Sequence, residues 1–383
     1  MKLNIIPSSP TLAINALASQ KKSAGERVFN LSAGEPMVKT NSTITAAVLK
    51  AINDGKTLYT PALGIPELRV AASAWMNKNF QTDFSVANTA VTNGGKFGLY
   101  ALCRTLLNPG DEAIVIAPYW TSYPSLIEIT GAKTVIVKTK EKNNWKVSTA
   151  DLQAAITDKT RAIFFNNAGN PTGTLYSKEE LKELIAVAAA KNVWFISDEV
   201  YSGLTYEQEF FSAASFSEFR DRVIIIQSVS KHFAMTGWRV GILFADKEIV
   251  NAIGDWQSQI TSGTATVSQY AALAAFQNSE EINKNIRTEM QVRRDVLITA
   301  LQTNINPKIS APAAGLYVFV SLVDLGVGEG DDQIFCEELL RVGNIALVPG
   351  SAFGAPGYVR LSFGASIQEL EEAVNALTHY LKK

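Results

Sequence analysis

Residues 228–241 read Ser-Val-Ser-Lys-His-Phe-Ala-Met-Thr-Gly-Trp-Arg-Val-Gly, which places Lys231 between two serines and an arginine. The apolar, β-branched run Val223–Ile226 before them predicts a buried strand. A lysine after such a strand can be desolvated. Desolvation and the nearby cation of Arg239 would lower its pKa and make its amine a nucleophile. The serines and the arginine can hold an anionic group beside that amine. A surface lysine on a loop is the alternative that this stretch leaves open.

Two polar groups follow other expected strands. Asp198 ends the apolar run Val193–Ser197, where a carboxylate is costly unless it is paired. This carboxylate can face a protonated ring nitrogen, and a helix cap is the common alternative. The segment Asn-Pro-Thr-Gly, which begins at Asn170, also follows a strand. Its asparagine can donate an amide hydrogen to a ligand oxygen, although the composition also suits a simple turn.

A glycine pair marks a third strand end, in the segment Thr-Asn-Gly-Gly-Lys at residues 92–96. The glycines let backbone N–H groups approach a ligand, and the N-terminus of the helix that follows favours phosphate. The spacing is not that of a P-loop. An ordinary turn between a strand and a helix explains the segment equally well.

Two larger side chains complete the set of candidates. Trp120 follows the expected strand Ala113–Ala117 and can offer a flat face to an aromatic ligand, or it can fill core. Arg360 lies inside an apolar strand, where a guanidinium needs an anionic partner, and its fork fits a carboxylate. A structural salt bridge is the alternative for this arginine.

The elements that must position these side chains alternate between short apolar runs and helical segments. This alternation predicts a mainly parallel sheet covered on both faces. Ligands of such sheets bind beyond the carboxyl ends of the strands, so we expect the candidates to meet at one edge. The expected strands are Thr89–Thr92, Ala113–Ala117, Thr134–Val137, Arg161–Phe165, Val193–Ser197, Val223–Gln227 and Val240–Phe244.

Helical patterns separate and follow these strands. A capping box of Ser177 and Glu180 predicts the start of one helix. We expect a large domain over residues 42–285 and a smaller α+β domain formed by residues 1–41 and 286–383. The other expected helices are Ile44–Ile52, Pro66–Asn77, Phe97–Leu107, Ser279–Gln302, Gln333–Val342 and Ile367–Tyr380, and the strands of the small domain are Gly315–Phe319, Ala346–Val348 and Val359–Phe363.

Composition excludes several classes of function. The 383 residues carry a net charge of −1, which argues against nucleic acid or an anionic membrane surface as the main partner. Cys103 and Cys336 are expected to be buried free thiols. Two histidines are too few for a histidine-based zinc centre, so no metal is expected. No signal peptide and no run long enough to span a bilayer is seen, and a cytoplasmic enzyme is expected.

Together, the candidates are the groups that pyridoxal 5'-phosphate (PLP) requires of a protein. The chain resembles the class I, fold-type-I PLP-dependent aminotransferases, and among them the bacterial aspartate aminotransferases of the Ib subgroup. The resemblance runs from the Ser-Ala-Gly-Glu-Pro segment at residues 32–36 to the Arg-Leu-Ser-Phe-Gly segment at residues 360–364. Its most specific motifs are Ser-x-Ser-Lys…Arg-x-Gly, Asn-Pro-Thr-Gly and Asp-Glu-Val-Tyr.

The resemblance implies a role for each candidate. Lys231 would carry PLP as a Schiff base and shuttle a proton, and Asp198 would pair with the pyridine nitrogen. Tyr201 is the third catalytic residue and would share the ring 3-oxygen with Asn170. The residues that would hold the cofactor are Gly95, Lys96, Trp120, Asn170, Asp198, Tyr201, Ser228, Ser230, Lys231, Arg239 and, from the neighbouring subunit of a homodimer, Tyr59. Those that would contact the substrate are Gly34, Lys96, Trp120, Asn170 and Arg360.

The resemblance also implies a substrate class. Lys96 would meet a distal carboxylate, which favours aspartate as amino donor and 2-oxoglutarate as acceptor in a ping-pong reaction; the alternative is a solvated lysine in a first helical turn. The chain departs from the family pattern at Met37, at Ala168 and at residues 262–264. Aminotransferases for aromatic amino acids, alanine or prephenate and arogenate, and a PLP-dependent C–S lyase, therefore stay open.

Overall fold

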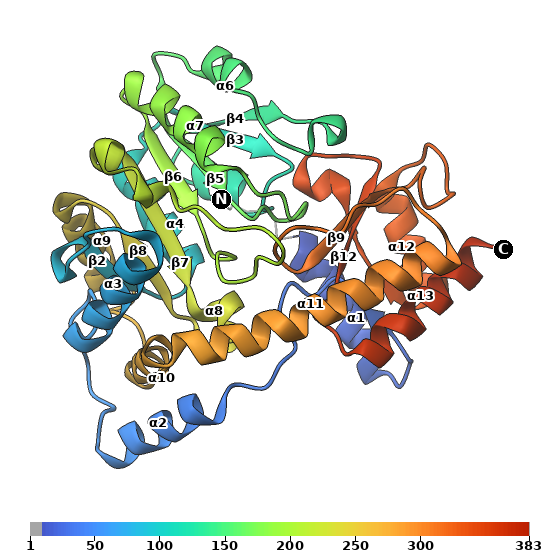
Figure 1. Ribbon diagram of the computed structural model, residues 1–383, viewed down its shortest axis with the longest axis horizontal. Helices are drawn as coiled ribbons and strands as arrows, with labels where there is room; N and C mark the ends of the chain where they lie inside the picture. Colours follow the sequence, from blue (N-terminus) through green and yellow to red (C-terminus); the bar gives the residue numbers. More distant parts are fainter. Residues whose placement is uncertain (1–9, 383) are drawn as a thin grey trace, which may run out of the picture.

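A seven-stranded sheet organises the larger part of the chain, with its strands in the order β2-β8-β7-β6-β5-β3-β4 (Figure 1). The computed structural model describes residues 10–382. Neighbouring strands run parallel except at β8, which is antiparallel to β2 and β7. The expected mainly parallel sheet is therefore confirmed. The strands are β2 (Thr89–Thr92), β3 (Glu112–Ala117), β4 (Lys133–Lys138), β5 (Thr160–Asn166), β6 (Trp194–Asp198), β7 (Val223–Ser228) and β8 (Gly241–Phe244).

Helices cover both faces of this sheet. The capping box at the start of α7 is confirmed: the Ser177 hydroxyl accepts from the Glu180 N–H at 3.2 Å, and the Glu180 carboxylate accepts from the Ser177 N–H at 2.7 Å. The helices of this part are α2 (Ser42–Asn53), α3 (Pro66–Phe80), α4 (Gly95–Leu106), α5 (Tyr123–Glu128), α6 (Thr149–Ala155), α7 (Lys178–Ala190), α8 (Val229–His232), α9 (Lys247–Ile260) and α10 (Thr266–Gln277).

The central strand β7 shows why the sheet is buried on both sides. Ile224 and Ile226 join the apolar cluster that contains buried residues of α4 and α9. Val223 and Ile225 point the other way and join the cluster that contains residues of α3, α7 and α10. Because successive side chains of a strand face opposite sides, a strand covered on both faces must be apolar throughout.

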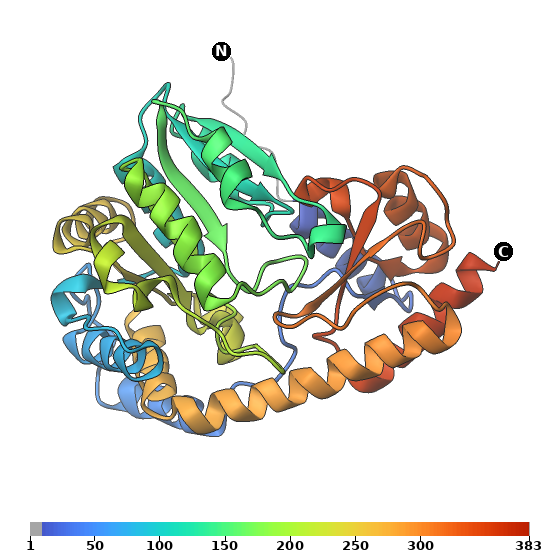
Figure 2. The ribbon, with the colours of Figure 1, turned by 45° about the horizontal axis from the view of Figure 1, so that its top comes forward.

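The C-terminal part forms a smaller region with two short sheets, in the orders β11-β12-β9 and β1-β10. The N-terminal segment belongs to it, because β1 pairs in parallel with β10. Figure 2 shows α11 running along the molecule from the large sheet to this region. The elements are α1 (Pro10–Ser23), β1 (Phe29–Asn30), α11 (Ser279–Asn304), β9 (Tyr317–Ser321), α12 (Asp332–Gly343), β10 (Ile345–Ala346), β11 (Val348–Pro349), β12 (Tyr358–Ser362) and α13 (Ile367–Leu381).

Several details differ from the expectation. The single strand expected at Ala346–Val348 is wrong, because its two ends pair in different sheets, β10 with β1 and β11 with β12. Helices α1, α9 and α10 were not anticipated. Among residues 11–23 of α1, only Ala18 is buried, so the sequence has no apolar stripe that would reveal the helix. The expected domain boundary at residue 285 falls inside the continuous helix α11. The division into two domains stays a prediction, and residues 1–9 of the expected small domain lie outside the described residues.

Two further points concern the backbone and the surface. The Ala117–Pro118 and Asn170–Pro171 peptide bonds, whose isomer the sequence leaves open, are both cis. Both cysteines are buried free thiols, as expected. Within residues 10–382, no helix combines the length and the apolarity that crossing a membrane requires.

Candidate active site

A cavity of about 450 Å³ lies at the carboxyl ends of the parallel strands, where β6 and β7 end. This is the edge at which open α/β sheets bind ligands. Tyr59 is the predicted site residue that this cavity does not include. The predicted residues that line it are Gly34, Gly95, Lys96, Trp120, Asn170, Asp198, Tyr201, Ser228, Ser230, Lys231, Arg239 and Arg360.

Lys231 lies in α8, the short helix that follows β7. The Ser228 hydroxyl caps this helix by accepting from the Ser230 N–H at 3.1 Å. The Lys231 Nζ donates to the carbonyl oxygen of Gly34, which comes from the N-terminal segment. Burial lowers the pKa of Lys231, and two nearby guanidinium groups act in the same direction. A lowered pKa leaves more of the amine neutral and nucleophilic.

Asp198 is 5% exposed at the end of β6. Tyr123 Oη donates to its Oδ2 at 2.7 Å, and the Val200 N–H donates to its Oδ1 at 3.3 Å. Burial raises the pKa of Asp198 to about 6, although both hydrogen bonds and the charge of Lys231 act to lower it. A buried carboxyl group with this pKa can share a proton with a basic ring nitrogen.

An anion cup lies between α4 and the segment after β7. The hydroxyls of Ser228 and Ser230 are 2.8 Å apart, and α4 begins at Gly95 and directs its free N–H groups toward the same space. Glycine is needed here: a Cβ on Gly94 would lie 2.5 Å from Arg239 Nη2, and one on Gly241 would lie 2.4 Å from the Gly95 nitrogen.

These groups fit PLP. The anion cup would hold its phosphate, Asp198 its ring nitrogen, and Lys231 its aldehyde carbon. Trp120 lines the same cavity and offers a flat face to the ring. Tyr201 Oη and the Asn170 side chain line the wall that the ring 3-oxygen would meet. Each group is explained by one part of a single ligand, which none of the separate alternatives achieves.

Arg360 lies in β12 and is 2% exposed. Its Nη1 donates to Asn170 Oδ1 at 3.0 Å, its Nη2 donates to the Ser32 carbonyl at 2.8 Å, and its Nε has no partner. The guanidinium also lies over the ring of Tyr317, 4.1 Å from the centroid. Among residues 10–382 it forms no ion pair with a carboxylate, so the structural salt bridge is not its explanation. A buried cation in this state calls for an anionic ligand.

Lys96 lies in the first turn of α4, on the side of the cavity lined by Trp120. Its Nζ lies 4.9 Å from the centroid of the Trp120 ring. Burial lowers the pKa of Lys96, and the charges of Arg239 and Lys231 lower it further. The side chain lines the cavity but stays exposed to solvent, so its ammonium group can meet either a ligand or water.

Other residues in or behind the cavity were not found from the sequence. Tyr123 lies behind Asp198 and does not line the cavity, and no local pattern shows that its hydroxyl reaches that carboxylate. Tyr317 Oη lies 2.9 Å from Tyr201 Oη, across the boundary between the two parts of the molecule. Helix α1 contributes Leu12 to the cavity. These contacts depend on the tertiary fold, so sequence spacing alone gives no signal for them.

Tyr59 lies outside the cavity of its own chain. Its side chain is 93% exposed, and Leu58 beside it is 79% exposed. Both line a groove with residues 261–267 and with Asn93, which immediately precedes the glycines of the anion cup. Tyr59 is thus an exposed aromatic side chain that lies in a groove beside Asn93, the residue before the glycines of the anion cup.

The chain is similar to known proteins over almost its whole length. Residues 26–377 match the family model described as aminotransferase class I and II. The aspartate aminotransferase of Thermotoga maritima is 37% identical over 99% of this chain and 98% of its own. The aspartate/prephenate aminotransferase of Thermus thermophilus is 35% identical over 99% of this chain and 98% of its own. A solved structure of the T. thermophilus aspartate aminotransferase with maleate has a TM-score of 0.93 at 33% identity, and the match covers 99% of this chain and 100% of that chain.

Replacing Asp198 with asparagine should stabilise the cofactor-free protein near neutral pH. The pKa of Asp198 is about 6 in the folded state against an ordinary 3.8, so the folded state binds more protons than the unfolded state between these values. Raising the pH through this window therefore lowers wild-type stability, by on the order of 3 kcal/mol. Thermal unfolding of both proteins should show a Tm difference at pH 7.5 that shrinks toward pH 4. Glu199, whose pKa burial raises to about 7, titrates in both proteins. The charge of Asp198 adds to that rise, so its loss in the variant lowers the pKa of Glu199 and increases the same Tm difference. A difference independent of pH contradicts this account.

Removing the Tyr123 hydroxyl should raise the pKa of Asp198 further, because its hydrogen bond favours the ionised carboxylate. An infrared titration of the buried carboxyl band in Tyr123→Phe should show a midpoint above that of the wild type, with Asp198→Asn identifying the band. Tyr176→Phe is the matched control, since this buried phenol accepts from the Val147 N–H instead. Equal midpoints in Tyr123→Phe and the wild type would show that the contact does not tune Asp198.

Proposed function

The chain belongs to the class I and II aminotransferases, a PLP-dependent family of enzymes, and we propose that it transfers the amino group of L-aspartate to 2-oxoglutarate. The observation that carries this proposal is a pair of cations in one cavity: the buried Arg360, which has no carboxylate partner among residues 10–382, and Lys96, which lies beside Trp120. Two cations suit a substrate with two carboxylates. Aspartate, glutamate and their oxo acids all have this property.

PLP, when bound, withdraws electrons from the substrate α-carbon and so makes its proton acidic. In the proposed reaction the protein supplies the rest. Lys231 would hold the cofactor through its Nζ, and the same amine would take up and release the substrate α-proton. Asp198 would keep a proton on the ring nitrogen. Its pKa of about 6 suits it to this sharing.

The substrate is oriented by groups on the opposite wall. Arg360 would bind the α-carboxylate through its two terminal nitrogens, assisted by the Gly34 backbone. Lys96 would bind the distal carboxylate. The same two contacts serve the amino acid and the oxo acid in turn, so we propose a ping-pong sequence in which one product leaves before the second substrate enters.

Relatives support a dicarboxylate. The T. thermophilus enzyme was solved with maleate, a dicarboxylate, and relatives from T. maritima and Geobacillus stearothermophilus are named aspartate aminotransferases. Prephenate, an oxo acid, is a second candidate for the amino acceptor, since relatives from Aquifex aeolicus and T. thermophilus are named aspartate/prephenate aminotransferases. Prephenate also carries two carboxylates, and Leu12 adds apolar surface at the cavity.

We further propose that the active unit is a homodimer in which Tyr59 of one subunit reaches the phosphate of the other. Besides Tyr59 and Leu58, exposed apolar side chains occur on α2 and α9, where Leu49 is 62% and Ile260 is 46% exposed. The groove at Tyr59 adjoins Asn93, next to the anion cup. A second copy of the chain would cover this surface and bring a phenol to the phosphate.

Lys231→Ala should lose the visible absorption band of the wild-type holoenzyme and lower kcat by about 10⁴-fold or more, because attachment and proton transfer both need the amine. Absorbance spectra with and without aspartate, and single-turnover rates, check this. Lys247→Ala, a change at an exposed lysine at the start of α9, is the control and should match the wild type. A wild-type protein that stays colourless after reconstitution with PLP would refute the assignment.

Lys96→Met keeps the length and packing of the side chain but removes its charge. We expect kcat/KM for aspartate with 2-oxoglutarate to fall by about 10- to 100-fold, the loss of one charge-assisted hydrogen bond, while half-reactions with alanine or phenylalanine change little. Pre-steady-state rates for the three donors check the selectivity. No aspartate turnover by the wild type would exclude the proposed substrate, and an equal loss for all donors would place Lys96 at the cofactor alone.

A further inference from the structure

Asn283, in the second turn of α11, touches two segments that carry site residues. Its Nδ2 donates to the carbonyl of Gly203 at 3.0 Å and to the carbonyl of His232 at 3.1 Å. Gly203 lies in the turn after Tyr201, and His232 directly follows Lys231. One side-chain amide therefore uses both of its hydrogens to tie together the backbones beside two proposed catalytic residues.

The approach of this amide depends on a glycine. A Cβ on Gly203 would lie 2.4 Å from Asn283 Nδ2 and 2.4 Å from the His232 Cβ. Any side chain at this position would push α11 and α8 away from the turn. The three residues thus form one close contact, in which Asn283 replaces the volume that a side chain of Gly203 would fill.

The contact matters most for α8. This helix spans only Val229–His232, and so short a helix has no stability of its own. Its last carbonyl groups lack partners within the helix, and the Asn283 amide satisfies the one of His232. The His232 ring adds only packing, since it is stacked on Trp75 at 5.4 Å and neither ring nitrogen has a partner among the described residues.

We propose that Asn283 is a positioning residue for the aminotransferase reaction: by holding the Gly203 and His232 carbonyls together, it fixes Lys231 and Tyr201 relative to each other. The proposal rests on the role proposed above for Lys231. The two hydrogen bonds of Asn283 go to Gly203 and His232, not to the anion cup or to Arg360. Because Ser230 of the cup lies in α8, Asn283 supports the cup only through that helix. Its main effect is on where the Lys231 amine lies and how well it is kept from water.

Asn283→Leu tests the proposal, because leucine has a similar size and suits a helix but donates no hydrogen bond. Without the tie, α8 loosens and water reaches Lys231. The pH midpoint for labelling Lys231 with acetic anhydride, measured by peptide mass spectrometry in the cofactor-free protein, should rise toward the ordinary lysine value by about half a unit or more. In the reconstituted enzyme, kcat should fall by about tenfold or more while KM changes by less than about twofold.

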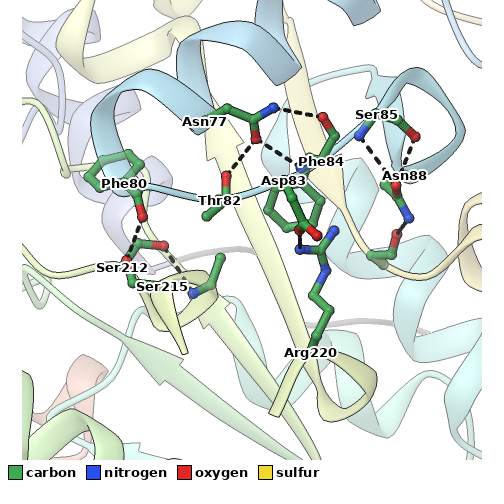
Figure 3. A network of polar contacts seen from close by, with 12 residues as sticks. Asn77, Phe80, Thr82, Asp83, Phe84, Ser85, Asn88, Ser212, Ser215 and Arg220 are labelled. Atoms are coloured by element: carbon green, nitrogen blue, oxygen red, sulfur yellow. Dashed lines mark hydrogen bonds and ion pairs between the residues drawn. The ribbon is translucent and has the colours of Figure 1, made fainter. Parts of the chain in front are cut away.

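Asn77→Leu is the matched control. Asn77 is also a half-buried helix residue, and its side chain donates to the Phe84 carbonyl at 2.8 Å and accepts from the Phe84 N–H at 2.8 Å, in a network away from the cavity (Figure 3). This change should lower Tm and leave the Lys231 midpoint and kcat unchanged. If Asn283→Leu also lowers only Tm, Asn283 is merely structural and the proposal is overturned.

Two further comparisons keep the result decisive. If Asn283→Leu does not fold, Asn283→Ala is measured against Asn77→Ala by the same two criteria, a shifted midpoint supporting the proposal and an unshifted one overturning it. The labelling midpoint needs neither cofactor nor substrate, so it does not depend on aspartate being the donor. A failure of the proposed role of Lys231 would show separately, as a Lys231→Ala variant that keeps its absorption band.

Discussion

The burial of several ionisable groups in one cavity is the constraint on which the rest of this structure depends. Removing a charge from water is costly, and a protein tolerates it only where partners or ligands compensate. Here Asp198 receives a phenol and a backbone N–H, and its pKa still rises to about 6. Arg360 receives two neutral oxygens and two aromatic faces, but no carboxylate among the described residues. The incomplete compensation is what makes the cavity a binding site: the groups are arranged for a ligand that carries the missing charges.

A parallel sheet makes such an arrangement possible, because its strands all end at the same edge. Their last residues therefore lie close together even when their side chains are short. Asp198 and Ser228 are the final residues of neighbouring strands. The antiparallel strand β8 then begins so close to the turn before α4 that a Cβ on Gly241 would meet the backbone of Gly94 and Gly95. The pairing of the strands therefore determines where the anion cup lies, and glycine allows the backbone segments around it to approach each other closely.

The candidate residues at this edge can be recognised in the sequence because each of them follows an expected strand. The same strand ends predict Asp198, Asn170 and Lys231, and β-branched runs predict the strands themselves. Tyr123 and Asn283 could not be predicted in this way. Each acts on a group that is distant in sequence, and an isolated phenol or amide in a helix has many equivalent uses. Helix α1 was not predicted for a related reason. It packs on β1, β10 and β11 through tertiary contacts, and its sequence has no apolar stripe that would reveal it.

Binding of the proposed substrate would also change the pKa of Lys231, because the substrate carries charges that oppose those of the nearby arginines. Burial and the charges of Arg360 and Arg239 together lower the pKa of Lys231. A carboxylate bound to Arg360 would neutralise one of these charges, and the pKa of Lys231 would rise. With substrate bound, the amine would then be a stronger base for the proton transfer proposed above, and before binding it would be more often neutral and so a better nucleophile. Because this change requires Lys231 to stay close to Arg360 and away from water, the backbone that carries the amine must be held from outside the cavity. A four-residue helix cannot do this alone, which gives a physical reason for a fixed contact between α8 and α11.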